Sequence, residues 1–389
     1  MSRFHSYLIN SKKLIETYKP GVPFYFHLKS FFQSQKKYGS RDRKIISSIC
    51  YHYFRCYFLF RENDFSENQL LYAVFICESS KGNLLEALAP ELNERVGMGI
   101  DEKLQHLKLH ESELFGFCDE LSECIDVSPF SRSFLTQPAL FLRIRPGKKA
   151  IVIHSIEKAK IEFEAIGDST LKLRNGINLD GVLKLDNQVI IQDFSSQHAM
   201  DFLLTTDFIN KKEKIPVWDA CAASGGKSIL LYDVLKGNIK LTVSDIRKNI
   251  LSNLQARLND AGVNIYKKFE QNLVLASGLD SNEKYSIVLC DVPCSGSGTW
   301  SRTPEQHFSF DKNQIDEFVK KQKAIVSNAL PHVEKNGLLI YMTCSIFKRE
   351  NEDVVDFIKD NYAAKLLQMD YIKGYEMNAD TMFVATFTL

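Results

Sequence analysis

The sequence predicts an α/β protein in three parts: an all-α N-terminal bundle, a small α+β domain and a doubly wound sheet of mostly parallel strands. Strand signals are scarce in residues 1–130, where apolar residues recur at helical spacing. After Pro138, short apolar runs are punctuated by glycine, as in short strands joined by tight turns. From Lys214 onward, strand-like and helix-like segments alternate, which is typical of a doubly wound sheet. The expected domains are 1–130, 131–210 and 211–389.

The N-terminal part is predicted to be helical and is rich in basic side chains. Ser40 is a suitable N-cap for a helix whose apolar residues recur at intervals of three and four. Residues 1–61 carry twelve Lys or Arg side chains, against only Glu16 and Asp42 as acids. Such a run is most often a solvated helix face. Because Phe and Tyr are interleaved with it, a phosphate-binding surface is an equally good interpretation.

The remaining elements are predicted from apolar runs. In the small domain, strands are expected at 139–145, 171–173, 182–185 and 189–192, with a helix at 151–165. In the C-terminal domain, strands are expected at 216–218, 240–244, 287–289 and 338–342. Helices between them are expected after Gly226, through Leu258 and across 315–330. This order brings the carboxyl ends of several strands to one edge of the sheet, where ligands bind in such folds.

Composition excludes several classes of protein. The chain has 389 residues, 44% hydrophobic and 25% charged, and its net charge of +1 is not that of a polycation. Its nine cysteines are scattered and form no CxxC pair, so no metal site is expected. No secretory segment opens the chain, and no apolar run is long enough to span a bilayer. We expect a reduced, cytoplasmic protein that does not contact membranes.

A loop with two adjacent glycines follows the predicted strand that ends at Asp219. Its candidate ligand-binding residues are Asp219, Cys221, Ala222, Ala223, Ser224, Gly225, Gly226 and Lys227. Glycine lets the backbone approach a ligand closely. A phosphate-binding P-loop requires a glycine where Cys221 stands, so a nucleoside triphosphatase is excluded.

Asp245 ends the next predicted strand, a position at which an acid accepts hydrogen bonds from ribose hydroxyls. The Asp219 carboxylate would repel phosphates and attract a cationic amino-acid group. The two acids together therefore indicate a cofactor that contains ribose but no pyrophosphate. S-adenosylmethionine is such a cofactor.

Two cysteines stand directly beyond predicted strands. Cys294 is three residues after Asp291, and Cys344 ends the run that contains residues 338–342. Side chains at these positions of a parallel sheet line one crevice, so the two thiols are expected to meet there. Two thiols in one crevice indicate covalent chemistry. The other cysteines, Cys221 excepted, are interpreted as core residues.

These segments closely resemble the RsmB/Sun-type RNA (cytosine-5)-methyltransferases. The matching motifs are Leu140–Arg143, Gln192–Gln197, Ala222–Ser228, Asp245, Asp291–Gly298, Arg302–Glu305, Thr343–Ser345 and Glu350–Glu352. The resemblance covers roughly residues 138–389. It implies a Rossmann-like methyltransferase domain that uses S-adenosylmethionine. Residues 1–130 look more weakly like the NusB-like RNA-binding domain of the branch that acts on 16S ribosomal RNA.

The resemblance also implies a role for each site residue. Cys344 would be the nucleophile that adds to carbon 6 of cytosine, which enables carbon 5 to attack a methyl sulfonium. Cys294 would assist breakdown of the covalent adduct, and Asp291 would hydrogen-bond the cytosine edge. The expected partner of this monomer is RNA, with a single-stranded or loop cytosine of 16S ribosomal RNA as the target. The alternatives are a transfer RNA substrate, or a catalytically degenerate protein that binds RNA in ribosome assembly.

The chain departs from the family pattern at two cofactor positions. Ser224 stands where the family has proline, which leaves the turn possible but less rigid. An acid near the adenine is replaced by Asn272, whose amide oxygen could accept a hydrogen bond from the adenine amine. Glu270 is the alternative residue for this contact.

Overall fold

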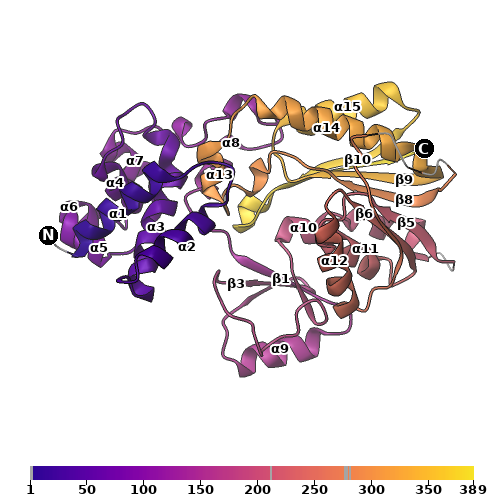
Figure 1. Ribbon diagram of the computed structural model, residues 1–389, viewed down its shortest axis with the longest axis horizontal. Coiled ribbons are helices and arrows are strands. Elements are labelled where there is room, and N and C mark those ends of the chain that lie inside the picture. The colour runs from indigo at the N-terminus through magenta and orange to yellow at the C-terminus, as the bar shows by residue number, and fades with distance from the viewer. Residues whose placement is uncertain (1–2, 211–212, 276–278, 280–281) are drawn as a thin grey trace. The chain divides into compact units, whose positions relative to one another are not determined.

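The computed structural model describes residues 3–210, 213–275, 279 and 282–389 (Figure 1). Its contacts divide the chain into two compact units. Unit 1 comprises residues 1–119, 126–137 and 300–312, and unit 2 comprises residues 120–125, 138–299 and 313–389. Both sheets therefore lie in unit 2, whereas the segment 300–312 belongs with the N-terminal helices. The division into three domains stays a prediction.

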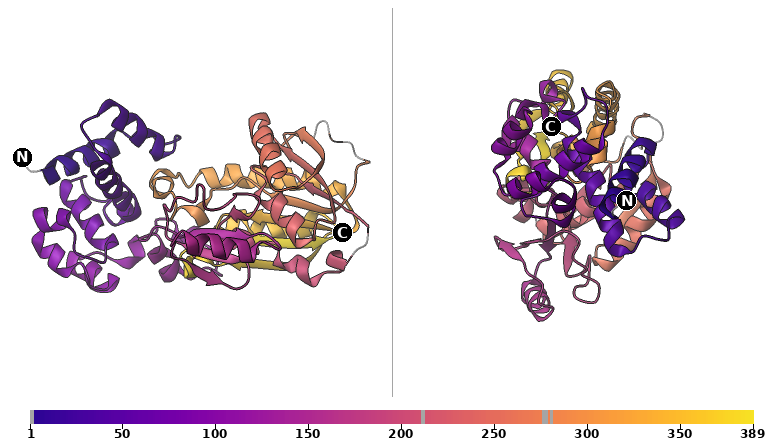
Figure 2. Two further views of the ribbon diagram at one scale, coloured as in Figure 1. Left: turned by 90° about the horizontal axis from the view of Figure 1, so that it is seen from below. Right: turned by 90° about the vertical axis from the view of Figure 1, so that its left-hand side faces the viewer.

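In the part that the structure describes, unit 1 contains helices and no strand (Figure 2, right). The helices are α1 (Arg3–Thr17), α2 (Phe24–Ser34), α3 (Ser40–Cys56), α4 (Glu67–Cys77), α5 (Asn83–Leu88), α6 (Pro90–Arg95), α7 (Ile100–Leu107), α8 (Val127–Ser133) and α13 (Pro304–Ser309). The N-cap of α3 is Gly39, one residue before the predicted Ser40. The reason is that the Asp42 carboxylate accepts a hydrogen bond from the Gly39 N–H (2.9 Å).

A buried arginine joins three segments of unit 1. Arg55, on α3, is only 2% exposed. Its Nη1 donates to the carbonyl oxygens of Phe134 (2.6 Å) and Ser301 (2.7 Å). Further bonds go from Nη1 to the carbonyl oxygen of Thr136 (3.2 Å) and from Nη2 to Gln137 Oε1 (2.5 Å). These bonds attach the segment 300–312 to helices that precede it by more than 160 residues in the sequence.

The small sheet of unit 2 is antiparallel, in the order β2-β3-β1-β4. Its elements are β1 (Leu140–Ile144), α9 (Lys149–Lys158), β2 (Glu164–Ile166), β3 (Thr170–Leu173) and β4 (Val189–Ile191). The helix predicted at 151–165 ends earlier, because Lys160 adopts a left-handed backbone (φ 55°) and the chain turns towards β2. The strand predicted at 182–185 is wrong: these residues form turns, and Leu183 is buried in the small core.

The large sheet has seven strands in the order β10-β11-β9-β8-β5-β6-β7, a Rossmann-like arrangement that confirms the predicted fold class. The strands are β5 (Ile215–Asp219), β6 (Ile239–Asp245), β7 (Ile265–Glu270), β8 (Tyr285–Asp291), β9 (Val333–Thr343), β10 (Lys365–Ile372) and β11 (Met382–Thr388). The helices are α10 (Phe194–His198), α11 (Gly226–Val234), α12 (Lys248–Asp260), α14 (Gln314–Ala329) and α15 (Glu352–Asn361). Helices α14 and α15 lie on one face of the sheet, and α11 and α12 on the other (Figure 1).

Strands β5 to β9 pair in parallel, and β11 pairs antiparallel with both β9 and β10. The antiparallel pair β10 and β11 was not predicted. Because the chain winds from β5 to β6 and β7 on one side and to β8 and β9 on the other, the order reverses at β5. The carboxyl ends of the strands beside that point form the ligand crevice in such folds. Among the described helices, none has the length and apolar character needed to cross a bilayer.

We predict that Arg55→Met lowers the free energy of unfolding of the whole protein by about 3 kcal/mol or more, because it leaves buried carbonyl groups without donors. Urea or thermal unfolding followed by circular dichroism measures this loss. Arg61→Met is the matched control, since Arg61 is 48% exposed and makes only weak surface contacts among the described residues, an ion pair with Glu62 and a contact over the Phe58 ring. Equal stability of the two variants would contradict a structural role for Arg55.

Candidate active site

The carboxyl ends of four parallel strands deliver the predicted site residues to one region of unit 2. Asp219 ends β5, Asp245 ends β6, Asp291 ends β8, and Cys344 directly follows β9. A cavity of about 740 Å³ opens there. Of the predicted site residues, those that line it are Cys221, Ala223, Asp245, Asn272, Asp291, Cys294 and Cys344. The structure thus brings the two thiols, Asp291 and Asp245 into one cavity.

The two thiols lie in contact. The Sγ atoms of Cys294 and Cys344 are 3.3 Å apart, and both cysteines are free. The hydrogen bond to Cys344 raises the pKa of the Cys294 thiol well above its ordinary value, and burial raises it further. Cys294 therefore keeps its proton at neutral pH. A protonated Cys294 can donate a hydrogen bond to the Cys344 sulfur.

A buried carboxylate holds the two cysteine loops together. Glu350 is fully buried, and Oε1 accepts hydrogen bonds from the Ser295 N–H and from Gln322 Nε2, both at 2.9 Å. Its Oε2 accepts hydrogen bonds from the hydroxyls of Ser295 and Ser345, both at 2.5 Å. Ser295 follows Cys294, and Ser345 follows Cys344, so one side chain fixes both loops. Glu350 belongs to one of the motifs that carry the family resemblance, but the sequence indicated no role for it.

The loop after Cys294 also depends on a close backbone approach. The Gly298 N–H donates to the carbonyl oxygen of Cys344 (2.9 Å). A Cβ atom on Gly298 would lie 2.3 Å from the carbonyl oxygen of Thr381, far inside contact distance. Glycine is therefore required at this position for the two cysteine loops to pack.

Asp291 lies beside a partly buried lysine. Lys227 Nζ is 3.4 Å from Asp291 Oδ2 and donates to Ser196 Oγ (2.8 Å). Asp291 is partly exposed, whereas Lys227 is nearly buried and is not among the residues that line the cavity. Lys227 thus orients the Asp291 carboxylate and connects it to α10, which carries the Gln192–Gln197 motif.

The two acids of the cofactor region have opposite environments. Burial raises the pKa of Asp219 to about 7, and its Oδ2 accepts a hydrogen bond from Ser228 Oγ (2.5 Å). Asp219 is fully buried beneath the loop and does not line the cavity. Burial alone would raise the pKa of Asp245. Hydrogen bonds from Arg247 and from the Ala223 N–H have the larger combined effect, so the pKa of Asp245 lies below its ordinary value. Asp245 therefore stays ionised and lines the cavity.

The rest of the predicted loop supports the site from outside the cavity. Ala222, Ser224, Gly225 and Gly226 are not among the lining residues. Ser224 Oγ accepts a hydrogen bond from Arg257 Nη1 (3.0 Å) instead. This bond supports the turn at the position where the family has proline.

Part of the cavity lining is apolar. Its apolar residues include Ile246, Leu273, Val274 and Ile325, none of which the sequence had singled out. Asn272 also lines the cavity, and its Oδ1 accepts a hydrogen bond from the Val274 N–H (3.0 Å). Glu270 ends β7 and is not among the lining residues.

The remaining cysteines fit the core interpretation in part. Cys50, Cys56 and Cys290 are buried, but Cys124 is exposed, which corrects that prediction. Cys124 is exposed because it lies in the loop 120–125, where Ser122 rather than Cys124 is buried. No group of three or more His, Cys, Asp or Glu side chains in the described residues could hold a metal ion.

Comparison with known proteins agrees with this geometry. Residues 206–387 match the family model described as 16S rRNA methyltransferase RsmB/F. The probable ribosomal RNA small subunit methyltransferase B of Bacillus subtilis (strain 168) is 27% identical over 235 residues, which are 59% of this chain and 51% of the relative. The chain thus spans about half the length of that curated relative.

Solved structures show the same fold. The crystal structure of PH0851 covers 98% of this chain and 97% of its own, with 19% identity and a TM-score of 0.69. A methyltransferase homolog protein from Pyrococcus horikoshii covers 74% of this chain and 97% of its own, with 20% identity and a TM-score of 0.57. The NusB-like character of residues 1–130 stays a prediction. The region 206–387, which holds the crevice and both thiols, is thus similar to the RsmB/F family of 16S rRNA methyltransferases.

Proposed function

We propose that this protein methylates carbon 5 of a cytosine in RNA, with S-adenosylmethionine as the methyl donor and 16S ribosomal RNA as the substrate. The observation that carries the proposal is the pair of thiols 3.3 Å apart at the ends of adjacent parallel strands, in one cavity with Asp245 and Asp291. Binding alone requires neither thiol, so the pair favours an enzyme over a degenerate RNA-binding protein. The names of the curated relatives favour ribosomal over transfer RNA.

The cavity fits S-adenosylmethionine at its ribose and adenine ends. The ionised Asp245 can accept hydrogen bonds from ribose hydroxyls, and Ile246, Val274 and Ile325 offer an apolar surface for adenine. When bound, this cofactor supplies an electrophilic methyl group. Asp219, buried and bonded to Ser228, supports the loop from below, and Lys227 keeps Asp291 oriented towards the substrate.

The two cysteines divide the covalent steps. The Cys344 thiolate forms a bond from Sγ to carbon 6 of cytosine, which makes carbon 5 nucleophilic; carbon 5 would then take the methyl group as the bond from that group to the donor sulfur breaks. Asp291 accepts a hydrogen bond from the exocyclic amine of cytosine or, when protonated, donates one to ring nitrogen 3, where negative charge develops on addition. Afterwards water takes the proton from carbon 5, the double bond re-forms, and Cys344 departs as a thiolate. Cys294, which holds its proton in the resting site, assists this release.

The target cytosine must leave its stack to reach the thiols, since both are partly buried. A cytosine in single-stranded or loop RNA is unstacked at least cost. Such a nucleotide is therefore the expected substrate.

The direct test uses ribosomal and transfer RNA from cells that lack the protein, with purified enzyme and methyl-tritiated S-adenosylmethionine. We expect label in 5-methylcytidine from 16S ribosomal RNA. Label only in transfer RNA would keep the chemistry and overturn the substrate. If folded protein incorporates no label, the degenerate RNA-binding protein becomes the better interpretation.

The two cysteines should give opposite phenotypes. We predict that Cys344→Ala abolishes the covalent RNA adduct, whereas Cys294→Ala accumulates it because release is blocked. Denaturing electrophoresis shows the adduct as a slow band that ribonuclease removes. Cys124→Ala, which alters an exposed thiol of the same unit, should behave as wild type. An adduct in Cys344→Ala but not in Cys294→Ala would exchange the assigned roles.

Glu350 should act through the cysteine loops. We predict that Glu350→Gln lowers kcat about 100-fold, because an amide nitrogen would face donors and shift the two loops. The affinity for S-adenosylmethionine, measured by calorimetry, should stay the same, since Glu350 does not line the cavity. Asp356→Asn, an exposed carboxylate paired with Lys359, is the control. A kcat of Glu350→Gln within twofold of wild type would contradict the role of Glu350 in positioning the cysteine loops.

A further inference from the structure

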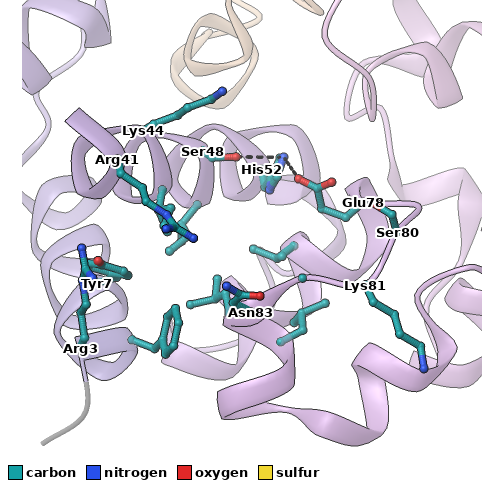
Figure 3. Close-up of a pocket in the computed structure, with 17 residues that line it drawn as sticks. Arg3, Tyr7, Arg41, Lys44, Ser48, His52, Glu78, Ser80, Lys81 and Asn83 are labelled. Carbon is teal, nitrogen blue, oxygen red and sulfur yellow. Dashed lines mark hydrogen bonds and ion pairs between the residues drawn. The ribbon is translucent and has the colours of Figure 1, made fainter. Parts of the chain in front are cut away.

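Unit 1 has a cavity of its own, of about 670 Å³, between α1, α3, α4 and the start of α5 (Figure 3). Its volume is within the range of small-ligand sites, about 300–1,000 Å³. The apolar side chains that line it are Phe4, Ile45, Ile49, Val74, Leu84 and Leu85. The proposed methylation chemistry uses no residue of this cavity.

The rim of the cavity is basic. Arg3, Arg41, Lys44 and Lys81 line it, against a single acid, Glu78. Two of these cations are already paired, Arg3 with Asp42 and Lys81 with Glu94.

Two cations of the rim are left without a partner. The side chains of Arg41 and Lys44 are exposed. Neither side chain forms a hydrogen bond or an ion pair with any residue that the structure describes. The guanidinium of Arg41 points into the cavity (Figure 3). The Lys44 side chain extends away from the cavity in Figure 3. One unpaired cation that points into an apolar cavity and a second beside its mouth favour an anionic ligand.

Polar groups of several kinds converge inside. Ser48 Oγ and Glu78 Oε1 lie 3.5 and 3.6 Å from His52 Nε2, while Asn83 offers both a donor and an acceptor (Figure 3). His52 Nδ1 is buried and has no hydrogen-bond partner among the described residues. These polar groups can form hydrogen bonds with the edge of a planar molecule. A site for inorganic phosphate alone would need neither the apolar walls nor an acid.

We propose that this cavity binds one unstacked nucleotide of an RNA strand, with its base among the apolar walls and its phosphate at Arg41 and Lys44. The proposal rests on the proposed function in that RNA is taken as the source of the nucleotide. Single-stranded RNA is recognised in this way, by a splayed-out base in a pocket and a backbone phosphate on cations. The same chemistry would also admit a free nucleotide, and the test separates these two sources.

The test measures binding of a 5′-fluorescein-labelled single-stranded RNA decamer of mixed sequence by fluorescence anisotropy, using the full chain. The double variant Arg41→Gln/Lys44→Gln should bind at least about tenfold more weakly, and its salt slope should be smaller by about 0.7, as expected when one phosphate is no longer neutralised. Lys29→Gln/Lys36→Gln removes the same charge from exposed positions outside the cavity and should bind like wild type. Circular dichroism melting confirms that each variant is folded.

A third variant tests the cavity itself. Ser48→Phe fills it without changing the charge and should weaken binding by a similar factor. Unchanged binding of Ser48→Phe would show that only surface charge matters and would overturn the proposal, as would equal binding of the two double variants. Competition by a mononucleotide mixture as strong as by unlabelled decamer would overturn RNA as the source. The assay contains no methyl donor, so it reports on this cavity even if the proposed methylation fails.

Discussion

The buried carboxylate of Glu350 is the constraint on which the active site depends. Two cysteines fifty residues apart in the chain meet at 3.3 Å at the ends of adjacent strands, and the loops that carry them share this acceptor. Four donors surround the carboxylate, so the buried charge is compensated by hydrogen bonds from serine, glutamine and the backbone. The two loops bear the reacting groups, and the group that aligns them lies outside the cavity.

Two acids at the ends of strands beside the crevice have different environments. Asp219 and Asp245 both end a strand, yet Asp219 is buried and its pKa is raised to about 7, while Asp245 is held ionised by Arg247 and the Ala223 N–H. The first supports the loop, whereas the second lines the cavity. The two thiols also differ from each other, since Cys294 keeps its proton beside Cys344. One cavity is thus lined by an ionised carboxylate and by a protonated thiol.

Unit 1 shows the same dependence on a buried polar group. Arg55 gathers backbone carbonyls from segments that the sequence separates widely, including Ser301. The segment 300–312 lies between the two cysteine motifs, and yet it packs with the N-terminal helices. The bond from Arg55 goes to a backbone carbonyl of this segment, so the type of residue there gives no sign of it.

The sequence by itself determined the fold class, the alternation of strands and helices from Lys214 onward, and the meeting of Cys294 and Cys344. These follow from local periodicity and from the rule that parallel strands end at one edge of a sheet. It could not place β10 and β11, which pair antiparallel with each other and with β9, because pairing partners are chosen by packing between distant segments.

Only the tertiary structure decided that Asp219 is buried, that Ser224 is supported by Arg257, and that Glu350 joins the cysteine loops. It also decided that the basic run of residues 1–61 includes two unpaired cations beside an apolar cavity. In each case the type of residue was readable in the sequence. Its burial and its partners were not, because they are set by contacts between residues far apart in the chain.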